Sequence, residues 1–598
     1  MLVGSLASSI AAGLPASVLA ASKKLVLING KIWTNNASAP YANALAISNG
    51  LILAVGSDSD MRSRLPGADV IDLRGRMTIP GLIDSHTHIV REGRFYILEL
   101  RWDGVTSLER GLQMISEQAR RTPKGQWVRV IGGWSPYQFS ERRLPTPEEL
   151  TQAAPDTPVF VSYLYSRGFL NRAGVDALAL TQEIAAKAPG GARYELRSSG
   201  AIIYAEPDPT LLYATIAALP TVSTADQIGS TRAFYRELNR FGLTGAIDVG
   251  GGGHKYPTDY IGSETLARDG ELPLRISFDL FPQRPGKELE DFSSWTRDFA
   301  LNKNLASELE NGFEIDGAGE FLTHSAGDFE NFLAPRPDLE SRPGWRKELL
   351  DVTQRLLQAR WPIRMHATYN ESITKIMEVF EAAHKAEVAA GRAGFSGLRW
   401  AIDHAETISV QNIARVKTLG GGIAIQDRMA FAGEYFAERY GRKAAASAPP
   451  LRDLIKSGVR LGAGTDATRV SSYNPWMAIQ WLVTGATVGG DRLMAERHRL
   501  SRVEALQMWT SGSAWFAGEA EMKGIIAAGR YADLAVLSDD IFSVSDDRIG
   551  GIESVLTITG GRVVHGNGEF TKLAPPMPDI MPLWSPIASF GGYQKRSE

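Results

Sequence analysis

The stretch Pro80-Gly81-Leu82-Ile83-Asp84-Ser85-His86-Thr87-His88 ends an apolar run with two histidines two residues apart. Side chains alternate along an extended strand, so the two imidazoles point to one side and can hold one metal ion. The chain contains no cysteine, so a transition-metal site must be built from histidines and carboxylates. Three further strand-like runs end in a metal-competent side chain, namely His366, His404 and Asp466.

Strand-like apolar runs alternate with helical patterns through the middle of the chain, which is typical of parallel βα units. We therefore predict an α/β fold built on a (β/α)₈ TIM barrel, with the five metal-competent residues on the face where barrel enzymes do chemistry. Nine runs compete for eight strand positions, so one belongs elsewhere. The candidates are 81–86, 158–164, 245–249, 275–280, 312–316, 363–367, 399–404, 421–425 and 460–466.

The two ends of the chain carry hairpin patterns, with apolar runs separated by Asn-Gly and similar turns. We expect them to pair into one small β-sandwich domain. Residues 282–345 and 427–450 are expected to be long loops, and the Pro-rich tail an arm across this subunit or, in a homo-oligomer, a neighbouring one. The predicted divisions are a signal-like segment (1–22), the first part of the sandwich (23–79), the barrel (80–515), the second part of the sandwich (516–574) and the tail (575–598).

The first 22 residues are small and apolar and resemble the apolar region and cleavage site of a signal peptide, although a basic start is missing. We expect export to the periplasm; if the segment is only an N-terminal arm, the protein stays in the cytoplasm. The segment is too short and broken for a membrane span. The net charge of -3 and the absence of basic clusters argue against nucleic acid as a partner, which leaves a small-molecule substrate.

Four segments together resemble the amidohydrolase superfamily, in particular its family 3 branch, which includes N-substituted formamide deformylases. The segments are Pro80–His88, Trp400–Ala405, Gly464–Ala467 and Gly524–Leu534. The resemblance implies that His86 and His88 hold an inner metal with Asp466, while His366 and His404 hold a second metal or contact the substrate. It also implies that Asp466 is the general base. The chemistry agrees, because a divalent ion lowers the pKa of bound water toward ~7 and a carboxylate beside that water can take its proton.

The chain departs from that branch in three places. The branch has a carboxylated lysine that bridges two metals, and the matching position is Gly312. Without the lysine, the site either holds one metal or is bridged by Glu314, which lies on the same face of the strand as Gly312. We expect one ion. Ser166 replaces a usual histidine, and Tyr369 lies where the branch has the glycine of a Gly-Asp pair.

Several lesser candidates lie near predicted strand ends or in a glycine-rich loop, where an aromatic wall or a cation could hold a substrate. The same residues could equally serve packing, surface ion pairs or solvent contacts. They are Trp134, Tyr165, Arg167 and His254.

The expected function is hydrolysis of a C–N bond in an amide-like small molecule. Metal-activated water would attack, with Asp466 as base and His404 or His366 polarising the carbonyl. Zn²⁺ is the expected ion, and Mn²⁺, Fe²⁺ or Co²⁺ are compatible with the same ligands. Two alternatives stay open. One is a metal-dependent hydratase or lyase, and the other is a non-catalytic small-molecule-binding barrel.

Overall fold

The computed structural model describes residues 24–188, 192–205, 209–299, 301, 311–328, 332–333 and 335–594. The signal-like segment 1–22 lies outside these residues, so export stays a prediction. In the part of the chain that the structure describes, no helix is long and apolar enough to cross a membrane.

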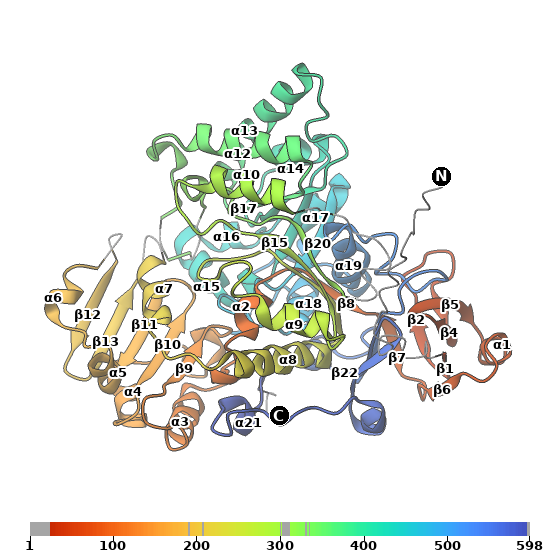
Figure 1. Cartoon of the computed structure of the whole chain (residues 1–598), viewed down its shortest axis with the longest axis horizontal. Coiled ribbons are helices and arrows are strands. Elements are labelled where there is room, and N and C mark those ends of the chain that lie inside the picture. The colour runs from red at the N-terminus through yellow and green to blue at the C-terminus, as the bar shows by residue number, and fades with distance from the viewer. Residues whose placement is uncertain are drawn as a thin grey trace, which may run out of the picture.

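Eight parallel strands form a TIM-like barrel in the centre of the molecule (Figure 1). The sheet is closed between its first and last strands, where the Asp466 N–H donates to the His86 carbonyl (2.8 Å) and the His88 N–H to the Ala467 carbonyl (3.1 Å). The predicted barrel is therefore confirmed. Its strands are β8 (Leu82–Thr87), β14 (Leu243–Asp248), β15 (Arg275–Leu280), β16 (Phe313–Ala318), β17 (Ile363–Ala367), β18 (Trp400–His404), β19 (Gly422–Gln426) and β20 (Arg460–Gly464).

The ninth candidate, residues 158–164, lies outside the barrel. It forms β10 (Val159–Tyr163), which pairs antiparallel with β11 (Arg167–Asn171) across a short turn. A hairpin cannot supply the helical crossover that a parallel barrel strand needs. These two strands belong to a separate five-stranded sheet, the inserted sheet, which lies to one side of the barrel (Figure 1) and also contains β9 (Val128–Ile131), β12 (Arg193–Arg197) and β13 (Gly200–Tyr204).

Helices follow most of the barrel strands. Residues 427–450, expected to be a loop, are mostly helical, because the apolar side chains of α15 pack into the protein interior. The described part of the 282–345 segment likewise contains the helix α10. The described helices of this part of the chain include α8 (Thr224–Arg240), α9 (Ile261–Arg268), α10 (Glu288–Asp298), α12 (Trp345–Ala359), α13 (Asn370–Ala389), α14 (Val410–Thr418), α15 (Arg428–Tyr440), α16 (Arg442–Ala445), α17 (Leu451–Ser457) and α18 (Pro475–Thr484).

The two chain ends form the predicted β-sandwich. One sheet holds β1 (Leu25–Ile28), β4 (Ala44–Ser48), β5 (Leu51–Gly56) and β6 (Asp69–Asp72). In the other, β7 (Met77–Pro80) pairs antiparallel with β21 (Leu534–Leu537), which joins the two ends of the chain. That sheet also holds β2 (Lys31–Trp33), β3 (Tyr41–Ala42), β22 (Ser554–Thr559) and β23 (Arg562–Gly566).

The sandwich leads directly into the first barrel strand through Gly81. A Cβ at this position would lie 2.1 Å from the Thr244 hydroxyl oxygen, so only glycine fits. The tail packs on this subunit, where the Ser585 hydroxyl donates to the Ile97 carbonyl (2.6 Å) and the Gln594 N–H to the Asp103 carbonyl (2.9 Å). A homo-oligomer stays a prediction.

Candidate metal centre

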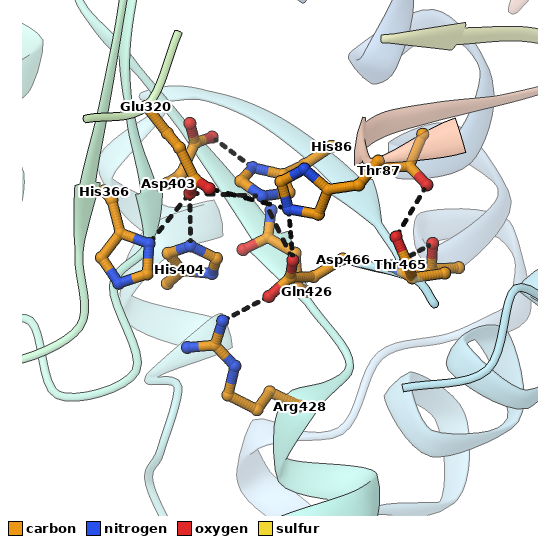
Figure 2. A network of polar contacts seen from close by, with 12 residues as sticks. His86, Thr87, Glu320, His366, Asp403, His404, Gln426, Arg428, Thr465 and Asp466 are labelled. Carbon is orange, nitrogen blue, oxygen red and sulfur yellow. Dashed lines mark hydrogen bonds and ion pairs between the residues drawn. The ribbon is translucent and has the colours of Figure 1, made fainter. Parts of the chain in front are cut away.

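All five predicted ligands lie buried at the carboxyl end of the barrel. Figure 2 shows four of them, His86, His366, His404 and Asp466. His86 is in β8 and His88 directly follows that strand, while Asp466 lies two residues beyond β20. Their side chains converge because the carboxyl ends of parallel barrel strands meet on one face. The remaining two, His366 and His404, come from β17 and β18.

The centre contains a sixth side chain that the sequence reasoning missed, Glu320. Its Oε2 lies 2.9 Å from the Nδ1 of His366, 3.3 Å from the Nε2 of His404 and 3.5 Å from the Nε2 of His86. Its Oε1 lies 3.6 Å from the Nε2 of His88. One carboxylate therefore faces all four histidines.

Two groups of side chains have the spacing of a metal site. In the first, His86, His88 and Asp466 place their ligand atoms within 4.8 Å of one another, and His86, Glu320 and His404 do so in the second. His366 adjoins the second group, since its ring centroid lies 4.1 Å from that of His404.

The structure places Glu320, and not Glu314, among the histidines. Gly312 precedes β16 and Glu314 is only its second residue, so both lie at the amino end of the strand. Glu320 follows the carboxyl end by two residues, where ligands of a barrel enzyme are expected. The rule that located Asp466 beyond its strand would have located Glu320 as well.

Polar groups behind the ligands hold the imidazole rings in place. The Nδ1 of His86 lies 3.3 Å from Asp403 Oδ1, and the Nδ1 of His88 contacts the Gly250 carbonyl oxygen. Partners of this kind on the far nitrogen leave Nε2 available for a metal. Arg364 holds Asp403 in turn, with Nε 3.1 Å from Oδ2.

The donors fit a divalent cation. Among the described residues, the buried Nε2 of His86 has no hydrogen-bond partner and faces Asp466 Oδ1 at 3.6 Å and the Glu320 carboxylate. Imidazole nitrogen and carboxylate oxygen are ligands that Zn²⁺ and its neighbours accept. His404 and Asp466 also adopt left-handed backbone conformations, with φ of 79° and 56°, a strain that is characteristic of functional sites.

The electrostatics of the centre favour positive charge. Burial alone would lower the pKa of His86, but the negative charge and hydrogen bond of Asp403, with Asp466 and Glu320, raise that pKa to about 10. Burial opposes ionisation of Glu320 and Asp466, yet hydrogen bonds from the histidines and, for Asp466, the charge of Arg428 hold both pKa values well below the usual range. The carboxylates are thus ionised, as metal ligands must be.

His404 has the opposite shift. Burial, together with the charges of His366 and Arg428, lowers the pKa of His404 to about 3. Its ring is therefore neutral at physiological pH, which is the form that binds a metal.

A cavity of about 600 Å³ opens onto the centre. Metal-competent side chains form its floor, and aromatic rings with arginines form its walls. The lining includes His88, Glu320, His366 and Asp466 on the floor, and Arg91, Tyr165, Tyr213, Phe281, Phe321, Arg342 and Arg428 on the walls.

The lesser candidates are placed differently from one another. Tyr165 lines the cavity as expected. Trp134 instead packs in the hydrophobic core against Trp102, because its indole N–H is satisfied by the Ser162 carbonyl (3.1 Å) inside the inserted sheet. Neither Trp134 nor Arg167 is in the cavity lining.

Arg167 lies over the Tyr204 ring, 4.6 Å from its centroid, on the inserted sheet. His254 is buried beside Tyr260, with its Nε2 3.2 Å from the hydroxyl, and is not in the cavity lining either. Burial and the charge of Arg91 lower the pKa of His254 well below its usual value, so this ring is neutral.

Known proteins resemble this chain over most of its length. A model described as "Amidohydrolase family" matches residues 69–565. An N-substituted formamide deformylase from Arthrobacter pascens is 24% identical and covers 90% of this chain and 98% of its own. The putative amidohydrolase YtcJ of Bacillus subtilis (strain 168) is 25% identical, covering 91% and 99%.

A solved structure has the same fold. It is an uncharacterized metal-dependent hydrolase from Pyrococcus horikoshii OT3, 20% identical, with a TM-score of 0.60. The match covers 88% of this chain and 99% of that one. The TIM-like barrel is thus the fold of a solved metal-dependent hydrolase, and the match to the amidohydrolase family agrees with a cluster of candidate metal ligands in that barrel.

Proposed function

The chain belongs to the amidohydrolase family, and from that premise we propose that it hydrolyses a C–N bond in an amide-like small molecule. The observation that carries the proposal is the convergence of four histidines and two carboxylates at one buried centre, onto which a cavity opens. A deformylase among the relatives supports an N-substituted formamide as the first substrate to test.

The centre offers ligands for two metal positions. His86, His88 and Asp466 would hold one ion, and His366 with His404 a second, with the Glu320 carboxylate between them. The expectation of a single ion depended on the missing lysine at Gly312. Because Glu320 supplies a carboxylate at the centre, we propose two ions, with Zn²⁺ as the favoured metal.

When bound, such an ion lowers the pKa of a water ligand and polarises a carbonyl oxygen. In the proposed reaction Asp466 would take the proton of the water and pass it to the leaving amine. Arg428 contacts its Oδ2, while its Oδ1 lies 3.0 Å from His88 Nε2. The ionised carboxylate can therefore act as a base from a fixed position.

The test combines Asp466→Asn with metal analysis and an N-substituted formamide as substrate. We expect release of the amine by the wild type and a loss of about 10²–10⁴-fold in kcat for the variant, as for removal of a general base. Unchanged turnover would exclude Asp466 as the base.

Isotope labelling distinguishes hydrolysis from the hydratase or lyase alternative. In ¹⁸O-water, hydrolysis places the label in a carboxylate product and releases an amine. Incorporation without amine release would contradict the proposal.

Glu320→Gln tests the number of metal positions by elemental analysis. We expect about two ions per chain in the wild type and fewer in the variant, because a neutral amide is a poorer metal ligand than a carboxylate. One ion in both proteins would contradict the second position.

A further inference from the structure

Two buried arginines lie beside the metal centre and form no ion pair with a carboxylate in the part of the chain that the structure describes. Arg91 is in α2 (Ile89–Gly93), directly after the His88 ligand, and Arg469 follows the barrel strand β20. Arg91 is only 5% exposed and Arg469 only 8%.

The contacts that the two guanidinium groups do make are with neutral groups. Arg91 donates from Nη2 to the Tyr165 hydroxyl (3.1 Å) and from Nη1, at 3.5 Å, to the Gly252 carbonyl. Within the described structure, Arg469 Nη1 is buried without a hydrogen-bond partner, and its guanidinium lies 5.1 Å from the Tyr213 ring centroid.

Glu99 attracts Arg469 but is paired with Arg101, whose Nη1 lies 2.8 Å from Glu99 Oε2. Asp248 attracts Arg91, and its carboxylate is also engaged elsewhere. Its Oδ2 accepts the Val90 N–H (2.7 Å) and its Oδ1 the Gly250 N–H (2.9 Å). Contact with aromatic rings offsets part of the cost of burying a cation, but two neighbouring cations also repel each other. The two buried guanidinium groups therefore form a candidate anion-binding site.

This positive site adjoins the metal centre. A Cβ on Gly251 would lie 3.2 Å from Arg91 Nη1 and 3.2 Å from His88 Nδ1, so the guanidinium and the back of the imidazole face the same small space. A Cβ on Gly252 would lie 3.3 Å from the Tyr213 hydroxyl oxygen. The glycine run found in the sequence therefore keeps this wall free of side chains.

The cavities place Arg91 where a substrate can reach it. Arg91 and Tyr213 line the cavity of about 600 Å³ above the metal centre and also an adjoining cavity of about 220 Å³. Arg469 lines the smaller cavity together with Arg94 and Arg129. Three carboxylates also line it, but Glu92 and Glu99 are paired with Arg101, and Asp259 is paired with Arg94. That smaller volume is below the usual range for a whole ligand but has room for one anionic group.

We propose that Arg91 binds a carboxylate of the substrate, and that Arg469 is a positioning residue which adds positive charge behind Tyr213. The substrate class is then a small N-acyl amino acid, whose carboxylate lies a few bonds from the scissile C–N bond. Aromatic walls at Tyr165, Phe281 and Phe321 suit an aromatic side chain on that acid. This inference rests on the proposed function for its reacting bond, but its anion site can be tested separately.

The experiment compares N-formyl-phenylalanine with N-formyl-phenylalaninamide, in which a neutral amide of similar size replaces the carboxylate. Calorimetric binding to zinc-loaded D466N and hydrolysis by wild type are measured. We expect the acid to bind at least about 10-fold more tightly than the amide, as for a charge-assisted hydrogen bond. Arg91→Met should remove that preference, and Arg91→Lys should restore part of it.

Two further variants separate an anion site from a general effect on the fold. Arg469→Met should raise KM for the acid while leaving kcat and the kinetics of the amide nearly unchanged. Arg193→Met is the matched control, because this exposed arginine also lies over an aromatic ring, 3.7 Å from the Tyr204 centroid, but on the inserted sheet. It should change neither constant.

The outcomes separate this inference from the proposed function. Tight, Arg91-dependent binding of the acid without hydrolysis would support the anion site and contradict amide hydrolysis of this class. Equal affinities for acid and amide, no binding of the acid, or Arg91-dependent binding of inorganic phosphate alone would overturn the inference. Hydrolysis of a neutral formamide would still support the proposed function.

Discussion

The two ends of the barrel both bury charged side chains, but they treat them differently. At the amino end, where the barrel meets the β-sandwich, Arg275 Nε lies 3.1 Å from Asp533 Oδ2, and the Gly560 N–H donates to Asp533 Oδ1 (2.7 Å). At the carboxyl end, carboxylates cluster with histidines, and Arg91 and Arg469 have no acidic partner among the described residues. Breaking a buried ion pair at a junction destabilises the fold, because it leaves one charge without its partner. A buried charge that has no acidic partner near a cavity indicates a ligand.

Metal removal should give the largest effect, because it takes away the charge around which the carboxyl-end cluster is built. We expect dialysis against a chelator to reduce hydrolysis to below about 1% of the starting rate, and added Zn²⁺ to restore it. Elemental analysis beside the activity assay checks this. Full activity in protein freed of metal would show that the cluster at the carboxyl end of the barrel does not depend on a metal ion for hydrolysis.

Breaking the amino-end pair should affect stability and not chemistry. Arg275→Met leaves the Asp533 carboxylate buried without its cation, and we expect a loss of about 3–5 kcal/mol in the free energy of unfolding. Denaturant unfolding measures the loss, and kcat per folded molecule should stay near wild type. Arg268→Met, at an exposed pair with Asp269, is the control and should change stability by less than about 1 kcal/mol.

Asp403→Asn should have an intermediate effect confined to the carboxyl end. The carboxylate orients His86 from behind, with its Oδ1 3.3 Å from Nδ1, so we expect a loss of about 10–100-fold in metal affinity or activity. Metal titration against a competing chelator checks this. If affinity is unchanged while the protein unfolds more easily, Asp403 serves only its pairing with Arg364.

A small pH effect is expected from the sandwich side. Burial, with the charge of Arg240, lowers the pKa of His565 to about 4, so the neutral ring favours the folded state. That stability is present above the unfolded pKa of about 6.5 and is lost as pH falls toward 4. Between pH 7 and 5 we expect a loss of about 1 kcal/mol, reduced for partial exposure, that is absent in His565→Gln. Denaturant unfolding of both proteins at pH 7 and pH 5 measures this loss. If the free energy of unfolding changes equally with pH in the wild type and in His565→Gln, the effect is excluded.

The sequence predicted the barrel and five of the six side chains at its metal centre, because strand ends are marked locally. An apolar run that stops at His86, His366, His404 or Asp466 needs no partner to be recognised. Residues 158–164 carried the same local pattern, so they stood among the nine candidates for eight barrel positions and the sequence did not identify them as the one that belongs elsewhere. Their antiparallel pairing depends on a neighbouring strand that periodicity does not identify.

Glu320 was missed because the family pattern directed attention to Gly312, at the wrong end of β16. Trp134 and Tyr165 looked alike in the sequence, yet one is in the hydrophobic core and the other lines the cavity. Which of two aromatic residues faces a cavity depends on how the inserted sheet packs against the barrel.

The sequence by itself determined that this chain makes a barrel with a histidine and carboxylate centre, since alternation, strand ends and the absence of cysteine are properties of neighbouring residues. Only the tertiary structure decided that Glu320 faces all four histidines, and that Arg91 and Arg469 are buried without an acidic partner in the described chain. Whether a charge is paired depends on side chains hundreds of residues away, and packing alone brings them within reach.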